Sequence, residues 1–413
     1  MRSKLLTSVC GLIALFSLGL QQANAQNGLE VEGQKSTQAQ TYKVLYNFSG
    51  QGTDGGYSSS SLVEDRAGNL YGTASSGGAH NKGVVFKLDK KGKGKVLYSF
   101  TGTGGDGSTP RGALVRDAAG NFYGTTYYGG DLTCNCGTVF KLDTTGKVSV
   151  LYSFRGYPDD GANPWAGVVR DVAGNLYGTT YGGGVDNTGT VFRLDTTGNE
   201  TVLHSFTGLA TGSTDGALPW AGLVRDHAGN LYGTTYAGPA GAGCGCGVIF
   251  KVDTSGNETV LYRFTGGADG GSPYAGLVRD AAGNLYGTTY FGGSTAACNT
   301  NGCGTVFKLD KAGKETVLYS FTGATDGANP FAGLVADKAG NLYGTTFAGG
   351  TYTYGTIFKL DTACKVTVRH SFSYSDGIDP EARLVRDSAG NLYGTTSFGG
   401  PSTDGGVVFK VTP

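Results

Sequence analysis

The sequence predicts an all-β fold, a seven-bladed β-propeller with four-stranded blades. The string Gly-Asn-(Leu/Phe)-Tyr-Gly-Thr occurs seven times, at spacings of 50 to 57 residues. Each copy contains four short segments rich in β-branched and aromatic residues and bounded by Gly, Asp, Asn or Pro. Seven units of this kind match the radial blades of a propeller. The copies begin at Gly68, Gly120, Gly174, Gly229, Gly283, Gly340 and Gly390.

The unit around Gly283 illustrates the strands that we expect in each blade. They cover residues 276–279, 284–289, 305–309 and 316–321. Apolar residues occupy successive positions in these segments and not only alternate ones, which indicates burial on both faces, as when sheets stack on sheets. No segment longer than about ten residues has the 3.6-residue apolar period of a helix.

The turns of the repeat have a recognisable chemistry. Asp-x-Ala-Gly-Asn joins the first two strands in all seven copies, from Asp65 to Asp387. The Asp carboxylate can accept hydrogen bonds from the turn, and Gly supplies the positive φ that closes a hairpin. Asp-x-x-Gly joins the last two strands in five copies, but the sixth copy has Cys364 in place of Gly.

The two ends of the repeat region predict a closed ring. The region opens with a lone strand of the fourth type at 43–48, and its last copy lacks a fourth strand. We therefore expect residues 43–48 to pair with 407–411, which removes the open edge between the first and the last blade.

The N-terminus predicts export. Arg2 and Lys4 precede an uncharged apolar run over residues 5–20, and Ala23-Asn24-Ala25 is a small-x-small cleavage site. The expected organisation is a signal peptide over 1–25, a flexible leader over 26–40 and the propeller over 41–413. We expect a secreted or periplasmic protein that is monomeric, with cleavage after Ala25 and no membrane span in the mature chain.

Charge and composition exclude several classes of protein. Removal of Arg2 and Lys4 leaves 30 basic and 32 acidic residues, which gives no electrostatic reason to expect nucleic acid or anionic membranes as partners. The 75 Gly residues lack a Gly-x-y period, which excludes collagen and suits a fold with many tight turns.

The strings Gly-Leu-Val-Arg-Asp, Gly-Asn-Leu-Tyr-Gly-Thr-Thr and Gly-Thr-Val-Phe-Lys-Leu resemble the Gloeobacter–Verrucomicrobium (GloVer) tandem-repeat family. The resemblance covers residues 41–413. It implies an exported or surface bacterial protein built from propeller-like repeats. It transfers no catalytic residues, and the C-terminal anchor found in various forms in the family is not visible in this chain.

We expect a ligand site on the face that carries the long, variable loops, near the central channel. The loop before the first strand of each blade has Pro-aromatic-Ala-Gly in four consecutive blades. Its aromatic residues are Trp165, Trp220, Tyr274 and Phe331. The other three blades have Ser59, Arg111 and Glu381 at this position. One arc of the ring is thus flat and apolar and suits a sugar ring, whereas the other is polar. The alternative is that the rings only fill the blade tops.

Three other repeated features have simpler explanations. Asp followed directly by Gly recurs in the same loop of every copy. It lacks the spacing of a calcium loop, so turn chemistry is favoured over a metal site. Arg ends the first strand in five blades, where pairing with turn carboxylates is favoured over a cationic channel lining. His204 and His370 replace a Tyr of the fourth strand, which indicates structural roles.

Three cysteine pairs lie in the loops between the second and third strands. In an exported protein they predict disulfides. The candidates are Cys134, Cys136, Cys244, Cys246, Cys298 and Cys303. Pairing between the cysteines of the fourth and fifth blades is an alternative, and zinc binding is disfavoured by export and irregular spacing. Cys364 is left over.

Catalytic signals are sparse. His80 and His227 lie at different repeat phases from each other and from the fourth-strand position that His204 and His370 share, and no Gly-x-Ser-x-Gly or phosphate-loop motif is present. We expect no catalytic residues, no metal and no cofactor. The leading hypothesis is a non-catalytic binding or scaffold propeller for a carbohydrate or cell-envelope polymer. The alternatives are a propeller enzyme, such as a polysaccharide lyase, a hydrolase or a virginiamycin-lyase-like protein, and a purely structural surface protein.

Overall fold

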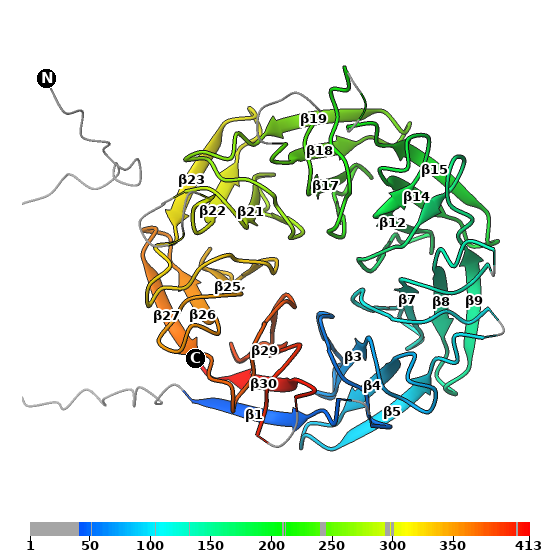
Figure 1. Cartoon of the computed structure of the whole chain (residues 1–413), viewed down its shortest axis with the longest axis horizontal. Coiled ribbons are helices and arrows are strands. Elements are labelled where there is room, and N and C mark those ends of the chain that lie inside the picture. The colour runs from blue at the N-terminus through cyan, green and yellow to red at the C-terminus, as the bar shows by residue number, and fades with distance from the viewer. Residues whose placement is uncertain are drawn as a thin grey trace, which may run out of the picture.

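Seven four-stranded antiparallel sheets are arranged radially around a central channel, as Figure 1 shows. The computed structural model describes residues 41–413 except 51, 104, 132, 209, 211, 240–244, 294–297, 299–300 and 402–403. The expected signal peptide and leader lie outside the described residues. Every named element is a strand, so the expected all-β, seven-bladed propeller is confirmed.

Each blade has four strands, from the channel to the rim. The innermost strands are β2 (Val63–Glu64), β6 (Val115–Arg116), β11 (Val169–Arg170), β16 (Val224–Arg225), β20 (Val278–Arg279), β24 (Val335–Ala336) and β28 (Val385–Arg386). The second strands are β3 (Leu70–Ala74), β7 (Phe122–Thr126), β12 (Leu176–Thr180), β17 (Leu231–Thr235), β21 (Leu285–Thr289), β25 (Leu342–Thr346) and β29 (Leu392–Thr395).

The two outer layers follow in the same order. The third strands are β4 (Val84–Leu88), β8 (Thr138–Leu142), β14 (Thr190–Leu194), β18 (Val248–Val252), β22 (Thr305–Leu309), β26 (Thr356–Leu360) and β30 (Val407–Val411). The rim strands are β5 (Gly94–Ser99), β9 (Val148–Ser153), β15 (Glu200–Ser205), β19 (Glu258–Arg263), β23 (Glu315–Ser320), β27 (Val366–Ser371) and β1 (Tyr42–Asn47). The innermost strands are two residues long, shorter than the four residues expected from the sequence.

The ring is closed by β1, which is the rim strand of the seventh blade. It pairs antiparallel with β30, with Val44 opposite Phe409 and Asn47 opposite Val407. In Figure 1 the blue β1 lies beside the red β30. The pairing of β1 with β30 has a one-residue register shift, and the pairings of third strands with rim strands in other blades have the same shift. The closing strand therefore reproduces the geometry of an internal one, and the sequence-based prediction of closure is confirmed.

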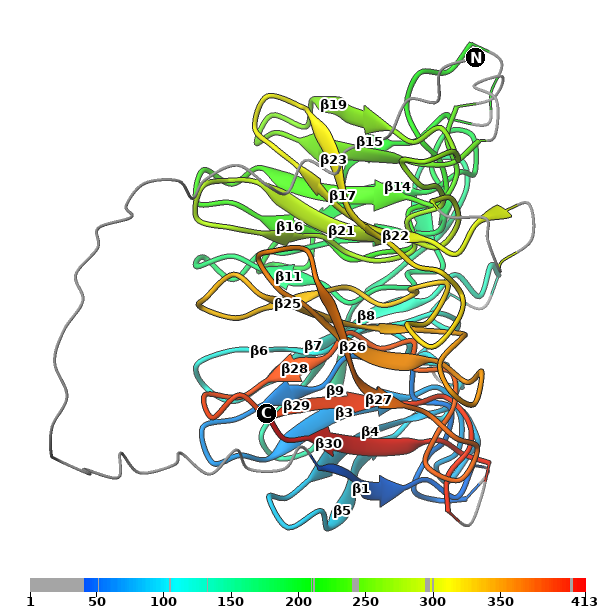
Figure 2. The same cartoon turned by 90° about the vertical axis from the view of Figure 1, so that its left-hand side faces the viewer.

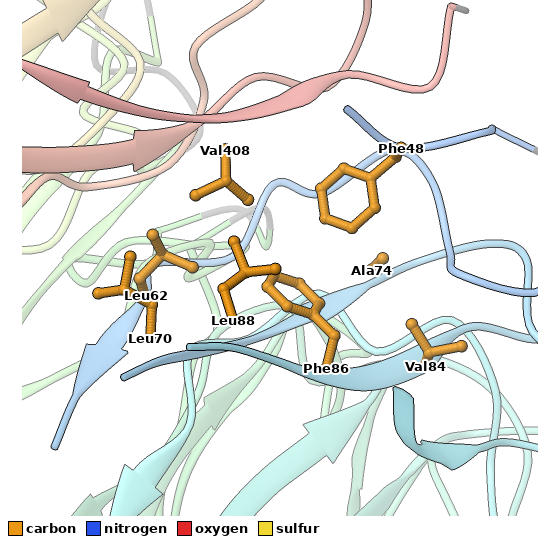
Figure 3. Packing of buried hydrophobic residues seen from close by; sticks show 8 residues of the cluster. All are labelled: Phe48, Leu62, Leu70, Ala74, Val84, Phe86, Leu88 and Val408. Atoms are coloured by element: carbon orange, nitrogen blue, oxygen red, sulfur yellow. The ribbon is translucent and has the colours of Figure 1, made fainter. Parts of the chain in front are cut away.

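Neighbouring blades are clamped together by pairs of phenylalanines. The Phe that follows each rim strand packs edge-on against the Phe of the third strand in the next blade, with ring centroids 5.0 to 5.4 Å apart in all seven interfaces. Figure 3 shows the copy made by Phe48 and Phe86, together with Val408 of the seventh blade. Because each blade covers the apolar face of its neighbour, the core consists of interfaces between blades.

The second Gly of Gly-Asn-Leu-Tyr-Gly-Thr makes room for this clamp. A Cβ atom on Gly178 would lie 2.7 Å from the ring of Phe192, and the other six copies give 2.5 to 2.8 Å. The following Thr side chain donates a hydrogen bond across the blade interface, as from Thr179 to the carbonyl of Ala221 at 2.9 Å. The motif is thus needed for stacking of the blades as well as for the turn.

The hairpin turn of each blade is organised by its Asp. The carboxylate of Asp171 accepts hydrogen bonds from the backbone and side-chain nitrogens of Asn175 at 2.9 and 2.8 Å, and from the Tyr177 hydroxyl at 3.1 Å. Burial alone would raise the pKa of the equivalent Asp65, but the hydrogen bonds of its turn outweigh burial and hold the pKa at about 2.

Four of the five arginines that end innermost strands pack on tyrosine faces of the preceding blade and do not pair with the turn carboxylates as expected, and the fifth, Arg116, lies over the ring of Phe122 in its own blade. The guanidinium of Arg225 lies 5.7 Å from the ring centre of Tyr177, and Arg170, Arg279 and Arg386 repeat this contact. A Tyr ring attracts a cation through its negative face. The ion pairs recorded among the described residues involve none of these four arginines.

The two faces of the ring differ. Figure 2 shows short turns on one face and longer loops crowded on the other. The longer loops connect second to third strands and lead from each rim strand into the next blade. No helix in the described part of the chain has the length and apolarity needed to cross a membrane.

Candidate functional site

A cavity of about 250 Å³ opens at the centre of the long-loop face. Its lining comes from all seven blades and includes every ring position singled out in the sequence. These positions are Ser59, Arg111, Trp165, Trp220, Tyr274, Phe331 and Glu381. The volume lies just below the range of roughly 300–1,000 Å³ that is typical of small-molecule sites. The sequence therefore located the residues that meet at the channel mouth, although ligand binding there is still a prediction.

Four of these residues form a continuous row of rings, here called the aromatic arc (Trp165, Trp220, Tyr274 and Phe331). Successive ring centroids are 4.2, 5.3 and 4.7 Å apart. All four side chains are half-buried. Contact between rings holds each in place, while the remaining exposure leaves surface for a ligand. The sequence left two alternatives for these rings, a ligand site or filling of the blade tops. In the structure the rings pack against one another and also line the cavity.

A second aromatic row supports the arc from behind and was missed in the sequence. It consists of the residue that follows Gly-Thr-Thr in five blades: Tyr127, Tyr181, Tyr236, Tyr290 and Phe347. Tyr127 and Tyr181 present their edges to Trp165 and Trp220 at 5.3 and 5.2 Å. The first and last blades have Ser at this position, on the side of the polar residues. Comparison of the repeats at this one position would have revealed the second row.

Backbone contacts between blades fix the loops that carry the arc. Asn163, two residues before Trp165, adopts a left-handed φ of 57°, and its N–H donates to the carbonyl of Cys136 in the preceding blade at 2.7 Å. The carbonyl of Ala166, just after Trp165, accepts a hydrogen bond from Thr125 of the same preceding blade. Trp165 is therefore held on both sides, so its ring is positioned before any ligand binds.

Each of these loops also pairs with another loop of its own blade. Bridges such as Ala217 to Ala237 and Ala328 to Ala348 join them, and in the third blade the contact extends to the two-stranded sheet of β10 (Gly161–Ala162) and β13 (Gly182–Gly183). Because the loops bearing the arc are cross-linked to their scaffold, they form a rigid rim.

The predicted disulfides Cys134–Cys136 and Cys298–Cys303 are confirmed. Cys244 lies outside the described residues. Cys246 is disulfide-bonded, as is Cys364, which the sequence left over, and no described cysteine is free. The carbonyls of Cys136, Cys246 and Cys303 accept the hydrogen bonds that fix the loops of Trp165, Tyr274 and Phe331. The loops that carry these cysteines thus brace the aromatic arc, and for the loop of Trp220 the carbonyl of Thr188 makes the same contact without a cysteine.

The opposite side of the cavity is polar, and we call Ser59, Arg111 and Glu381 the polar arc. The Arg111 guanidinium lies 4.2 Å from the ring centre of Trp165 and joins the two arcs. The Glu381 carboxylate accepts a hydrogen bond from the Ser397 hydroxyl at 3.1 Å. Burial raises the pKa of Glu381 and lowers that of Arg111, while the opposite charge of each partly offsets the shift of the other.

Several polar atoms at the cavity lack partners within the described part of the chain. The hydroxyl oxygen of Ser59, Nε of Arg111 and the indole nitrogen of Trp220 are all buried without a hydrogen bond. Leaving a buried polar group unpaired costs roughly 1–3 kcal/mol, so such groups call for an explanation. The same unpaired Nε occurs on Arg170, Arg225 and Arg279, which do not line the cavity, and all of these atoms are shielded from solvent, so they reflect packing of the blades and not a ligand site.

The recurrent Asp of the long loops is structural. Asp106 accepts hydrogen bonds from the Tyr98 hydroxyl at 2.9 Å and from the backbone and side chain of Thr101 at 2.8 Å. His204 and His370 contact the equivalent Asp of their loops at 3.1 and 3.0 Å, as the Tyr does elsewhere. Within the described ranges no three His, Cys, Asp or Glu side chains group as metal ligands.

The fold and the cavity define a class: a closed seven-bladed propeller with a braced aromatic rim around its channel. Within that class the chain belongs to the Gloeobacter/Verrucomicrobia repeat family, whose model matches residues 20–214, 132–335 and 293–413. The predicted family is therefore confirmed. No curated protein matches the chain.

Solved structures share the fold at low sequence identity. The extracellular domain of a putative hybrid two-component system from B. thetaiotaomicron is 13% identical with a TM-score of 0.55, over 90% of this chain and 41% of that one. The extracellular domain of a putative one-component system from the same organism is 10% identical with a TM-score of 0.53, over 85% and 37%. The chain thus spans about two fifths of these proteins, and the likeness concerns the propeller fold alone.

Proposed function

We propose that the chain is an exported, non-catalytic propeller that binds carbohydrate at the channel mouth. The observation that carries the proposal is the aromatic arc, whose half-buried rings line a cavity that polar and charged side chains also line. Aromatic faces stack on the C–H faces of sugar rings, and fixed donors and acceptors provide specificity for hydroxyls. Export is supported by the N-terminal pattern and by the disulfides, which form in oxidising compartments.

The tyrosines behind the aromatic arc are poor candidates for a catalytic base. Burial raises the pKa of Tyr127 and of Tyr290, so neither phenol is poised to abstract a proton near neutral pH.

A glycan array tests the proposal. Wild-type protein should bind a subset of glycans, and the double variant Trp165→Ala/Trp220→Ala should lose at least roughly tenfold in affinity, since two stacking rings are removed. Tyr157→Ala is the matched control, because Tyr157 is 62% exposed and does not line the cavity. Trp220→Phe keeps an aromatic ring but removes the indole N–H, so it separates stacking from hydrogen bonding.

Each outcome has a definite meaning. Binding that survives the double variant would rule out the aromatic arc as the site. Absence of binding to any glycan would favour a purely structural role. Shortened or unsaturated products in the incubated glycan would establish an enzyme instead. Circular dichroism of each variant checks that the propeller is intact.

A further inference from the structure

The repeat symmetry is broken at the channel by Arg383. Arg383 lies two residues after Glu381, at a repeat position that holds a small residue in the other six blades. The equivalent residues are Ser61, Ala113, Gly167, Gly222, Gly276 and Gly333. Stacking of blades therefore has no need of a long side chain here. Arg383 lines the same cavity as the aromatic arc and has solvent-exposed surface.

Arg383 is anchored yet keeps its charge available. Its Nε donates to the carbonyl of Leu334 at 2.8 Å, which fixes the stem and directs the guanidinium within the channel. Burial lowers its pKa, but a guanidinium stays charged at physiological pH. No ion pair recorded among the described residues includes it.

Arg111 is the second cation on the cavity and is likewise absent from the recorded ion pairs. Its guanidinium stacks on Trp165, and its buried Nε has no hydrogen-bond partner in the described part of the chain. The aromatic face compensates part of the lost hydration, and no carboxylate of the described residues is recorded in an ion pair with the planar fork of donors.

Only one carboxylate opposes these cations in the lining. Glu381 is tied to the Ser397 hydroxyl and is not within ion-pair distance of either arginine among the recorded pairs. Two guanidinium groups and one carboxyl group give the cavity a positive balance, although the whole chain has a net charge of zero. A local cationic site in a chain without net charge selects anions through that site and not through the overall field.

We infer that the carbohydrate bound at the channel mouth is an anionic sugar unit of an acidic polysaccharide, whose acidic group is received by Arg111 and Arg383 while its ring lies against the aromatic arc. The inference rests on the proposed carbohydrate-binding function and specifies its ligand. The fork of donors on Arg matches the paired oxygens of a carboxylate and also fits a sulfate, and both groups occur on acidic glycans.

Matched ligand pairs test the inference by isothermal titration calorimetry. One pair is a panel of oligouronates, made of galacturonic, mannuronic or glucuronic acid, against the same oligomers with the carboxyl groups reduced to alcohols. The other is a sulfated oligosaccharide against its desulfated form. At least one acidic probe should bind roughly tenfold or more tightly than its neutral twin, as expected for loss of a charge-assisted hydrogen bond.

Variants assign that preference to the two arginines. Arg383→Ala restores a small residue that the equivalent position of the second blade tolerates, and Arg111→Ser restores the Ser59 of the first blade. Each should weaken binding of the acidic probe by a larger factor than binding of the neutral twin, and so reduce the preference between them. The control Arg66→Ala removes the same charge from an exposed turn outside the cavity and should change neither.

The outcomes separate this inference from the function on which it rests. Equal binding of acidic and neutral twins would overturn the anionic ligand and keep carbohydrate binding. A preference that survives both arginine variants would also overturn it, because the acidic group would then be held elsewhere. Failure of every probe, acidic and neutral, would overturn the proposed function itself. Preference for the uronate or for the sulfated probe identifies the acidic group.

Discussion

Glu315, the first residue of β23, is a partly buried acid whose charge should lower the stability of the propeller above neutral pH. Burial, with a smaller contribution from the charge of Asp269, raises its pKa from 4.5 to about 7. Its Oε1 atom is buried without a hydrogen-bond partner in the described residues. Because the folded chain holds this proton more tightly than the unfolded chain does, the stability from this group is fully present below pH 4.5 and is lost as the pH rises towards 7.

The shift sets the size of the effect. Two and a half pKa units correspond to about 3.4 kcal/mol at 1.36 kcal/mol per unit. Glu315 is only partly buried, so solvent screening reduces the expected cost to about 1 kcal/mol. Glu315→Gln should therefore be more stable than wild type by about 1 kcal/mol at about pH 8, and the difference should vanish near pH 4.5.

Urea unfolding followed by circular dichroism at both pH values measures this difference. Glu315→Val is a second variant, since the equivalent residues of the second and sixth blades are Val148 and Val366. It should show a gain at high pH at least as large as that of Gln. A gain from Gln that is the same at both pH values would refute the reasoning, because the benefit would then not arise from removal of a buried charge.

Three further perturbations test the ring and its rim. Phe48→Ala should cost roughly 3–5 kcal/mol in urea unfolding, because the side chain is fully buried at the closing interface; a loss below about 1 kcal/mol would contradict closure. Gly287→Ala should destabilise by at least about 1–3 kcal/mol, since its Cβ would lie 2.5 Å from the Phe307 ring; an unchanged unfolding midpoint would contradict that packing. Replacing Cys298 and Cys303 together by Ser should weaken glycan binding severalfold while the folded signal persists, and unchanged affinity would show that the disulfide does not brace the aromatic arc.

The fold could be predicted from the sequence because the repeat specifies both the hairpins within each blade and the number and closure of the blades. The Asp-x-Ala-Gly-Asn turn sets each hairpin by contacts within a few residues, as at Asp171 and Asn175. The lone strand at 43–48 and the missing fourth strand of the last copy specify closure by counting alone. Both inferences use periodicity, which a single sequence contains in full.

The site was only partly predictable, for physical reasons. Trp165 and Arg111 stood out because they occupy one repeat position, and a ring brings equivalent positions together at its axis. Arg383 and the second aromatic row, such as Tyr181, lie at neighbouring positions whose direction depends on side-chain packing across blades. The bracing of Phe331 through the carbonyl of Cys303 is a backbone contact between loops, which residue types do not encode.

The central claim is that ligand is held at the channel mouth, and tryptophan fluorescence tests it most directly. The chain has only two tryptophans, Trp165 and Trp220, and both line the cavity. Titration with a glycan that binds by calorimetry should therefore give a saturable change in selectively excited tryptophan emission, with the same dissociation constant. Calorimetric binding without any change in emission would contradict the account, because the glycan would then lie away from both rings.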